Sequence, residues 1–258
     1  MKIAIIGVGH MGSWLMGQFA EEHEVAVFDV MPKEELADCS VKWLASISEL
    51  ETFRPQMLIN AVSLENTVAL FEEVVGLLPP DCILVDVASV KSDFNDRYTA
   101  WNLPFVSVHP MFGPTFADMD SLREESSIII RESDEQGKKF FVDLFAHLGI
   151  KVFEYSFSEH DQMMAYALTT PFVASLVFAG CVDNKTVPGT TFKRHRLLAE
   201  GLLAEDDHLL TEVLFNPSSI AQLDKITNKL EFLKHVIRAK DSDEAKEYFA
   251  ALRKNMFT

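Results

Sequence analysis

Short apolar runs alternate with longer amphipathic stretches from the start of this 258-residue chain to about residue 155. Brief apolar runs indicate strands, whereas apolar positions spaced three or four residues apart indicate helices. Amphipathic stretches such as 67–78 and 134–148 separate the apolar runs. The alternation predicts an α/β fold with a doubly wound parallel sheet. The expected strands are 2–6, 25–29, 57–62, 82–87, 105–108, 126–131 and 150–155.

Only helical spacing is found after Phe157. Ser158 to Asp161 has the Ser-x-x-acid form of a capping box, which marks the start of a helix. The stretch 159–181 is apolar around most of its circumference, and Pro171 is expected to kink it. The pattern predicts an α/β domain over 1–156 and an all-helical domain over 157–258. Further helices are expected at 192–205, 206–215, 217–238 and 241–254, the last of them capped by Asp241.

The long apolar helix bears on oligomeric state. A helix that is apolar on nearly all sides must be buried on all sides. The helical domain is too small to cover 163–179 by itself, so we expect a homodimer built through the helical half. The alternative is a helix covered only by the first domain of its own chain.

A glycine-rich turn, Gly7-Val-Gly9-His10-Met11-Gly12, joins the first expected strand to the first expected helix. In such a turn the first glycine permits the tight bend, the second lets the backbone approach a pyrophosphate, and the third lets the helix pack on the strand. The helix N-terminus adds free N–H groups and a positive dipole end for the phosphates. The turn therefore predicts a Rossmann dinucleotide site formed by these residues. The alternative is a glycine turn without a ligand.

Asp29 ends the second expected strand, where a carboxylate can accept hydrogen bonds from ribose hydroxyls. The same charge would repel the 2′-phosphate of NADP, so NAD is the expected cofactor. Ser63 follows the third expected strand. It is expected to border the nucleotide, because ligands of such sheets lie at the carboxyl ends of the strands.

Composition narrows the range of partners. The formal net charge of -16 argues against nucleic acid and anionic membranes, because both need a basic face. No apolar run is expected to reach the ~20 residues of a membrane span. Cys39, Cys82 and Cys181 lie far apart and form neither a metal-binding pattern nor a disulfide framework, which favours the cytoplasm and a site without metal.

His109 is the strongest candidate for a proton-accepting residue, since histidine titrates near neutral pH. It closes the fifth expected strand and begins His-Pro-Met-Phe-Gly113-Pro, so it is expected at the crevice that holds the cofactor. The alternative is that it stabilises the turn. His160, next to Asp161 at a helix start, is explained more readily by capping.

Ser89 is the second candidate, because it follows the fourth expected strand on the same side of the sheet. Its hydroxyl could bind the substrate alcohol or the nicotinamide amide. The alternative is an N-cap for a helix that starts near Lys91.

Three motifs together resemble the prephenate/arogenate dehydrogenase family of tyrosine biosynthesis. They are the glycine turn, Asp86-Val-Ala-Ser89-Val-Lys91, and His109-Pro-Met-Phe-Gly113, with looser similarity through 159–161, 202–206 and 214–216. The resemblance implies a Rossmann domain followed by an all-helical dimerisation domain. It implies NAD-dependent oxidative decarboxylation of prephenate to 4-hydroxyphenylpyruvate. In that reaction His109 would accept the proton of the ring hydroxyl, and Ser89 would orient hydroxyl, histidine and nicotinamide.

The resemblance also implies a cationic group that holds the ring carboxylate. The family often uses an arginine on a helix of the second domain, at a position where this chain has Gly201. Lys193 matches a second basic position of the family, and Arg196 lies three residues later on the same helix face. Further candidates for substrate contacts are Gly113, Thr169 and Thr170.

Three other functions stay open. One is arogenate dehydrogenation, which gives tyrosine directly. Another is a small-acid dehydrogenase of the β-hydroxyacid type, but those enzymes rely on a lysine in the long helix, and 159–181 contains none. The third is a nucleotide-sensing protein without catalysis, which would not require His109 and Ser89 at adjoining strand ends.

Overall fold

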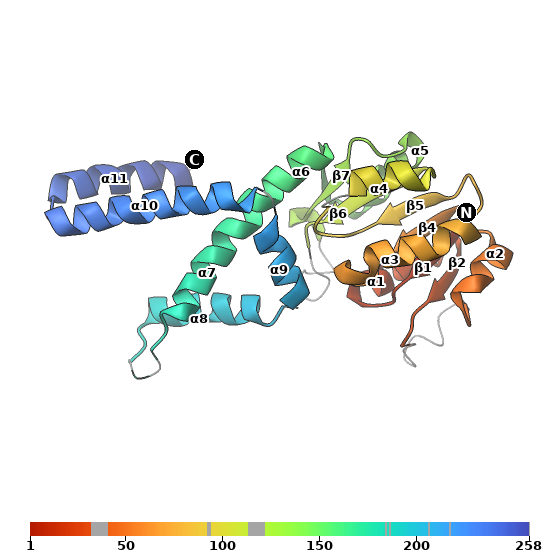
Figure 1. Cartoon of the computed structure of the whole chain (residues 1–258), viewed down its shortest axis with the longest axis horizontal. Helices are drawn as coiled ribbons and strands as arrows, with labels where there is room; N and C mark the ends of the chain where they lie inside the picture. Colours follow the sequence, from red (N-terminus) through yellow and green to blue (C-terminus); the bar gives the residue numbers. More distant parts are fainter. Residues whose placement is uncertain are drawn as a thin grey trace. The chain divides into compact units, whose positions relative to one another are not determined.

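The computed structural model forms two compact units, Met1–Met163 and Met164–Thr258 (Figure 1). The boundary lies seven residues later than the expected one, so His160 and Asp161 belong to the first unit. The structure describes residues 1–31, 41–91, 94–112, 122–183, 185, 187–205, 207–216 and 218–257.

Among the described residues, eight strands of the first unit form one sheet in the order β3-β2-β1-β4-β5-β6-β7-β8. All the expected strands are present, and β3 was not predicted because two residues are too short to show a period. The strands are β1 Lys2–Ile6, β2 Glu24–Phe28, β3 Lys42–Trp43, β4 Met57–Asn60, β5 Ile83–Asp86, β6 Phe105–Pro110, β7 Ser126–Ile130 and β8 Lys151–Tyr155.

One strand pair departs from the expected parallel sheet. β6 and β7 run antiparallel, with His109 opposite Ile128, whereas every other pair of neighbours is parallel. Parallel neighbours need a long crossover, usually a helix. In the described part of the connection between β6 and β7, only the short turn Leu122–Glu124 is helical. The expectation of a fully parallel sheet was therefore wrong at this pair.

Helices pack on both faces of the sheet, as a doubly wound fold requires. α1 His10–Phe19 and α5 Glu135–Leu148 bury apolar side chains with Ile3 and Ile5 of β1. α3 Leu64–Val74 and α4 Phe94–Trp101 pack on the other face, with Ala4 and Ile6. Because side chains alternate along a strand, one apolar run serves both clusters. The short helix α2 Leu50–Phe53 also contributes to the second cluster.

The last helix of the first unit, α6 Phe157–Met164, begins with a capping box two residues earlier than predicted. The Ser156 hydroxyl accepts the Glu159 N–H at 3.2 Å, and the Glu159 carboxylate accepts the Ser156 N–H at 2.8 Å. Phe157 is buried against the cluster that contains Phe105, which fixes the start of the helix. His160 and Asp161 consequently do not cap the helix.

The second unit is helical, and Asp241 caps its last helix as predicted by accepting the N–H groups of Asp243 and Glu244. A π-helical turn, Ala165–Thr169, precedes Pro171, the second residue of the following helix. The proline ring does not fit the interior of a regular α-helix, and the wider π-helical turn before Pro171 makes room for it. The helices are α7 Thr170–Gly180, α8 Thr190–Leu203, α9 Asp207–Phe215, α10 Ser219–Ala239 and α11 Ser242–Met256 (Figure 1).

The helical stretch Phe157–Gly180 is long and apolar enough to cross a membrane by length and composition alone. The expectation that no run reaches this length was wrong, because the acidic residues lie only in the first turns, at Glu159 and Asp161. Among the described residues it is the single helix of this kind. A helix packed within a soluble assembly has the same composition, so the stretch by itself is weak evidence for a membrane.

Candidate active site

A cavity of about 630 Å³ lies at the carboxyl ends of β1, β2 and β4. Gly7, Gly9, Asp29 and Ser63, all predicted to contact a nucleotide, are among its lining residues. Three other predicted contacts, His10, Met11 and Gly12, are not among them. His10 is exposed at the first turn of α1, and Met11 packs on the hydrophobic core.

The three glycines of the turn meet different constraints. Gly7 has φ +91°, and a Cβ there would lie 2.7 Å from the backbone of Ala61. A Cβ on Gly12 would overlap the carbonyl oxygen of Gly7. A Cβ on Gly9 would meet nothing within 4 Å. Gly7 and Gly12 are therefore needed by the fold itself, whereas the space at Gly9 is left for a ligand.

The cavity combines hydrogen-bond donors with one acid. No side chain caps α1 and no acid lies in its first turn, so its N–H groups are available to phosphates. The Asp29 carboxylate accepts the N–H groups of Val8, at 2.6 Å, and Met31, at 2.8 Å. These bonds fix its position at the end of β2, and each oxygen keeps a second lone pair for a ribose hydroxyl. The residues present therefore fit a dinucleotide.

His109 lies in β6 and is 6% exposed. Val106 and Val108 point to the face covered by α1 and α5, so the alternation along the strand turns Phe105 and His109 to the opposite face. The start of α6 packs on that face through Phe157. The His109 backbone carbonyl accepts a bond from Ser127 on β7, which ties it into the sheet.

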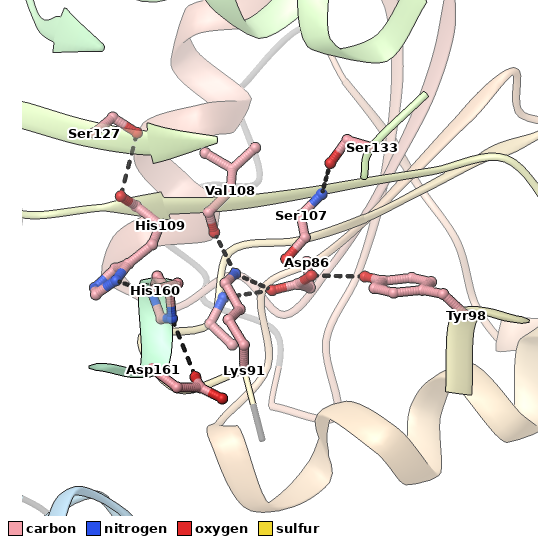
Figure 2. A network of polar contacts seen from close by, with 11 residues as sticks. Asp86, Lys91, Tyr98, Ser107, Val108, His109, Ser127, Ser133, His160 and Asp161 are labelled. Carbon is pink, nitrogen blue, oxygen red and sulfur yellow. Dashed lines mark hydrogen bonds and ion pairs between the residues drawn. The ribbon is translucent and has the colours of Figure 1, made fainter. Parts of the chain in front are cut away.

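His160 of α6 is the partner of His109 (Figure 2). Nδ1 of His109 and Nε2 of His160 are 3.0 Å apart, and His160 is completely buried. On its other side, His160 Nδ1 lies 3.3 Å from a carboxylate oxygen of Asp161. Sequence reasoning missed this pairing, since helical spacing could not show that α6 crosses the end of β6. The available signal was the adjacent pair His160 and Asp161 at the start of a helical stretch that is mostly apolar farther along.

A second buried polar group lies beside this row and was also missed (Figure 2). Lys91 is fully buried, and its ammonium group contacts Asp86 at 2.5 Å and donates to the carbonyl of Val108 at 2.8 Å. The Tyr98 hydroxyl donates to the other Asp86 oxygen at 2.6 Å. The Asp86–Lys91 pair thus links the end of β5 to the residue before His109.

Burial and neighbouring charge control the protonation of the two histidines. Burial, with His160 and Lys91 beside it, holds the pKa of His109 well below the usual 6.5. Burial also lowers the pKa of His160, and the nearby Asp161 carboxylate opposes that shift. A histidine with a lowered pKa is uncharged at neutral pH. His109 is therefore in the form that can accept a proton.

Ser89 lies half-buried in the loop after β5, at the same end of the sheet as His109. The alternative that it caps the next helix is wrong, because Val90 and Lys91, which follow it, are not helical. Gly113 lies outside the described residues.

The four candidates in the helical unit have different surroundings. Lys193 is exposed on α8, and Arg196 is already paired with Glu200 at 2.7 Å. Thr169 is buried, and its hydroxyl bonds to Ser219 at 2.7 Å, which gives it a structural role between the π-helical turn and α10. Thr170 is exposed at the start of α7.

Comparison with known proteins identifies relatives of this chain. Residues 32–148 match the family model of the prephenate dehydrogenase nucleotide-binding domain. The T-protein of Enterobacter agglomerans is 27% identical over an alignment of 162 residues that covers 58% of this chain and 43% of that protein. Arogenate dehydrogenase 1, chloroplastic, of Arabidopsis thaliana is 24% identical over an alignment of 248 residues that covers 91% of this chain and 39% of that protein. The chain thus spans about two fifths of the length of these curated relatives.

Solved structures extend the likeness over both units. Prephenate dehydrogenase from Aquifex aeolicus, in complex with hydroxyphenyl propionate and NAD⁺, has a TM-score of 0.84 at 17% identity, over 99% of this chain and 97% of that one. Synechocystis arogenate dehydrogenase has a TM-score of 0.79 at 17% identity, over 99% of both chains. At this identity the structures establish a Rossmann-type domain with a helical part. With the family model over 32–148 and the curated relatives, they show that this chain is similar to the prephenate/arogenate dehydrogenase family.

Proposed function

We propose that this chain is a NAD-dependent dehydrogenase that converts prephenate to 4-hydroxyphenylpyruvate with loss of CO₂. The observation that carries the proposal is a buried, uncharged histidine at the carboxyl end of a Rossmann strand. A dehydrogenase acting on an alcohol needs such a base. A nucleotide-sensing protein has no use for one.

The cavity at the glycine turn is the proposed cofactor site. The N–H groups of α1 would hold the pyrophosphate, Gly9 would let it approach, and Asp29 would accept the ribose hydroxyls. When bound, NAD⁺ supplies the hydride acceptor. The T-protein and the arogenate dehydrogenase are much longer than this chain, so their activities support its assignment only as members of the same family.

His109 is the proposed catalytic base. The ring hydroxyl of the substrate gives its proton to His109 as its carbon loses a hydride and becomes carbonyl-like. The bond between ring and carboxylate then breaks, its electron pair enters the ring, and CO₂ leaves. The ring becomes an aromatic phenol, which supplies the driving force. Ser89, at the same end of the sheet, is the proposed group that orients the hydroxyl.

Lys193 is the proposed anchor for a substrate carboxylate, with Arg196 second because Glu200 already neutralises it. Gly113 and Thr170 stay candidates for substrate contacts, whereas the buried hydroxyl of Thr169 is engaged with Ser219. Arogenate is the second candidate substrate, since two relatives are arogenate dehydrogenases. It carries an amino group where prephenate carries a keto group, on the side chain away from the reacting hydroxyl.

We also propose that the chain works as a homodimer in the cytoplasm. No residue of α7 is buried within the single chain, although the helix is almost wholly apolar. A second copy would cover that surface. Cys82 and Cys181 are unpaired thiols, which suits a reducing compartment.

The test is formation of NADH from NAD⁺, followed by absorbance, with prephenate and with arogenate in parallel. We expect turnover of prephenate. Turnover of arogenate alone would mean that arogenate, and not prephenate, is the substrate. If neither compound is turned over, the proposed function is wrong. Gly9→Ala should weaken NAD⁺ binding without harming the fold, since its Cβ would enter only open space. Gly17→Ala on α1 also enters open space and is the matched control.

A further inference from the structure

We propose that His160 and Asp161 are positioning residues that fix the tautomer of His109, so that its Nε2 is the unprotonated nitrogen. The inference deepens the proposed function and rests on it for its catalytic meaning. The arrangement itself is a property of the first unit alone and needs no substrate. It follows from the row formed by these three side chains (Figure 2).

The Asp161 carboxylate determines which nitrogen of His160 carries the proton. An ionised carboxylate can only accept hydrogen bonds, and a neutral imidazole has one donor nitrogen and one acceptor nitrogen. The Asp161 oxygen lies 3.3 Å from Nδ1 of His160. The proton of His160 is therefore on Nδ1, where it is donated to Asp161, and Nε2 carries the lone pair.

The tautomer of His160 in turn determines the tautomer of His109. Nε2 of His160 faces Nδ1 of His109 at 3.0 Å, and an acceptor on one side requires a donor on the other. The proton of His109 is consequently on Nδ1. Its remaining nitrogen, Nε2, is left with the lone pair that can take a proton from a substrate hydroxyl.

The opposite assignment leaves a buried hydrogen bond unmade. With the proton of His160 on Nε2, its Nδ1 lone pair would face the Asp161 oxygen, and two acceptors would meet. His160 has no exposed surface through which water could relieve that contact. The fully buried Lys91 carries a positive charge close to both rings, paired with Asp86, and disfavours a second proton on either ring.

The direct test is NMR of the full chain with ¹⁵N-labelled histidine rings, without ligand. His109→Gln and His160→Gln assign the two rings by loss of their signals. We expect both rings in the wild type to carry the proton on Nδ1. A wild-type His109 protonated on Nε2 would overturn the inference.

Asp161→Asn supplies the matching perturbation. The side-chain amide introduced by this substitution can donate to His160 Nδ1, which would reverse both tautomers and put the proton of His109 on Nε2. We then expect kcat to fall about 100-fold or more, as a wrong tautomer disables a catalytic histidine, with NAD⁺ affinity unchanged. An unchanged His109 tautomer in a folded Asp161→Asn protein, verified by circular dichroism, would contradict the proposal.

Replacing His160 separates positioning from packing. His160→Gln keeps an oxygen that can accept the His109 proton, whereas His160→Leu fills the space without an acceptor. We expect His160→Gln to retain at least about tenfold more kcat than His160→Leu, the worth of about 1.4 kcal/mol. Equal losses of kcat in the two variants would mean that His160 contributes only packing and does not position His109. His147→Leu, an exposed histidine on α5, is the control. If the wild type forms no NADH with either substrate, the proposed function fails, and the NMR measurement still decides the tautomer.

Discussion

The two units of this protein differ in the kinds of side chain that they bury and expose. The first unit buries charged and titratable groups, Asp86, Lys91, His109 and His160, and gives each a partner within the same unit. The second unit leaves large apolar side chains exposed on its helices, with Ile237 72% exposed. In a single chain the first unit therefore supplies partners for its buried polar groups, whereas the second leaves apolar side chains uncovered.

The largest expected effect removes the buried base. His109→Asn should lower kcat by about 10²–10⁴-fold, the usual contribution of a positioned proton acceptor. NAD⁺ affinity, measured by fluorescence titration, should stay the same, because the glycine turn is untouched. Ser89→Ala should lose less. Near-normal turnover by His109→Asn would show that His109 is not the proton acceptor, and the buried polar groups of the first unit would then have no demonstrated role in catalysis.

A matched pair of ion-pair variants compares burial in the two units. Lys91→Met leaves the Asp86 carboxylate buried without its cation, and should cost about 3–5 kcal/mol of the free energy of unfolding. Arg196→Met breaks the exposed pair with Glu200 and should cost at most about 1 kcal/mol. Urea denaturation measures both. Similar costs would show that the buried pair has no special role.

The third prediction concerns the exposed cations of α8. If Lys193 holds a substrate carboxylate, Lys193→Ala should raise KM for the substrate about 30-fold or more, the equivalent of about 2 kcal/mol, with NAD⁺ affinity unchanged. Arg196→Ala should raise it less, because Glu200 competes for that guanidinium. A rise in KM for Arg194→Ala alone would mean that the wrong helix face was chosen.

The fourth prediction tests whether the apolar surface of the second unit meets another copy. Val177 on α7 is 53% exposed, and burying a valine between subunits contributes roughly 1.5–3 kcal/mol. Val177→Asp should therefore shift a dimer toward monomer in light scattering at micromolar concentration. Val142→Asp, a partly exposed valine on α5 in the first unit, is the control. A wild-type monomer with full activity would refute the dimer.

Sequence patterns anticipated the fold better than the pairings inside the site. The apolar runs and glycine turn located the expected strands, because burial on both faces of a sheet leaves a strong local signal. The antiparallel β7 and the contact between His109 and His160 depend on how distant segments cross, which no local period records. Lys91 was missed for the same reason. A lysine is rarely buried unless it is paired, and the sequence pattern does not show that pairing.

The smallest expected effect is a pH dependence of stability that originates in the first unit. Burial, His160 and Lys91 hold the pKa of His109 well below 6.5 in the folded chain, whereas the unfolded chain binds that proton near 6.5. Below pH 6.5 the unfolded state therefore holds more protons, and the free energy of unfolding decreases as pH falls toward the folded pKa. The slope is at most about 1.4 kcal/mol per pH unit for one histidine, and this group adds no slope above pH 6.5. Denaturation at pH 7.5, 6.5 and 5.5 should show a shallower slope in His109→Asn than in the wild type, while His147→Asn, exposed on α5, keeps the wild-type slope. Identical slopes in all three proteins would mean that His109 titrates as if it were solvated. The burial of polar groups in the first unit would then have no measurable effect on the protonation of His109.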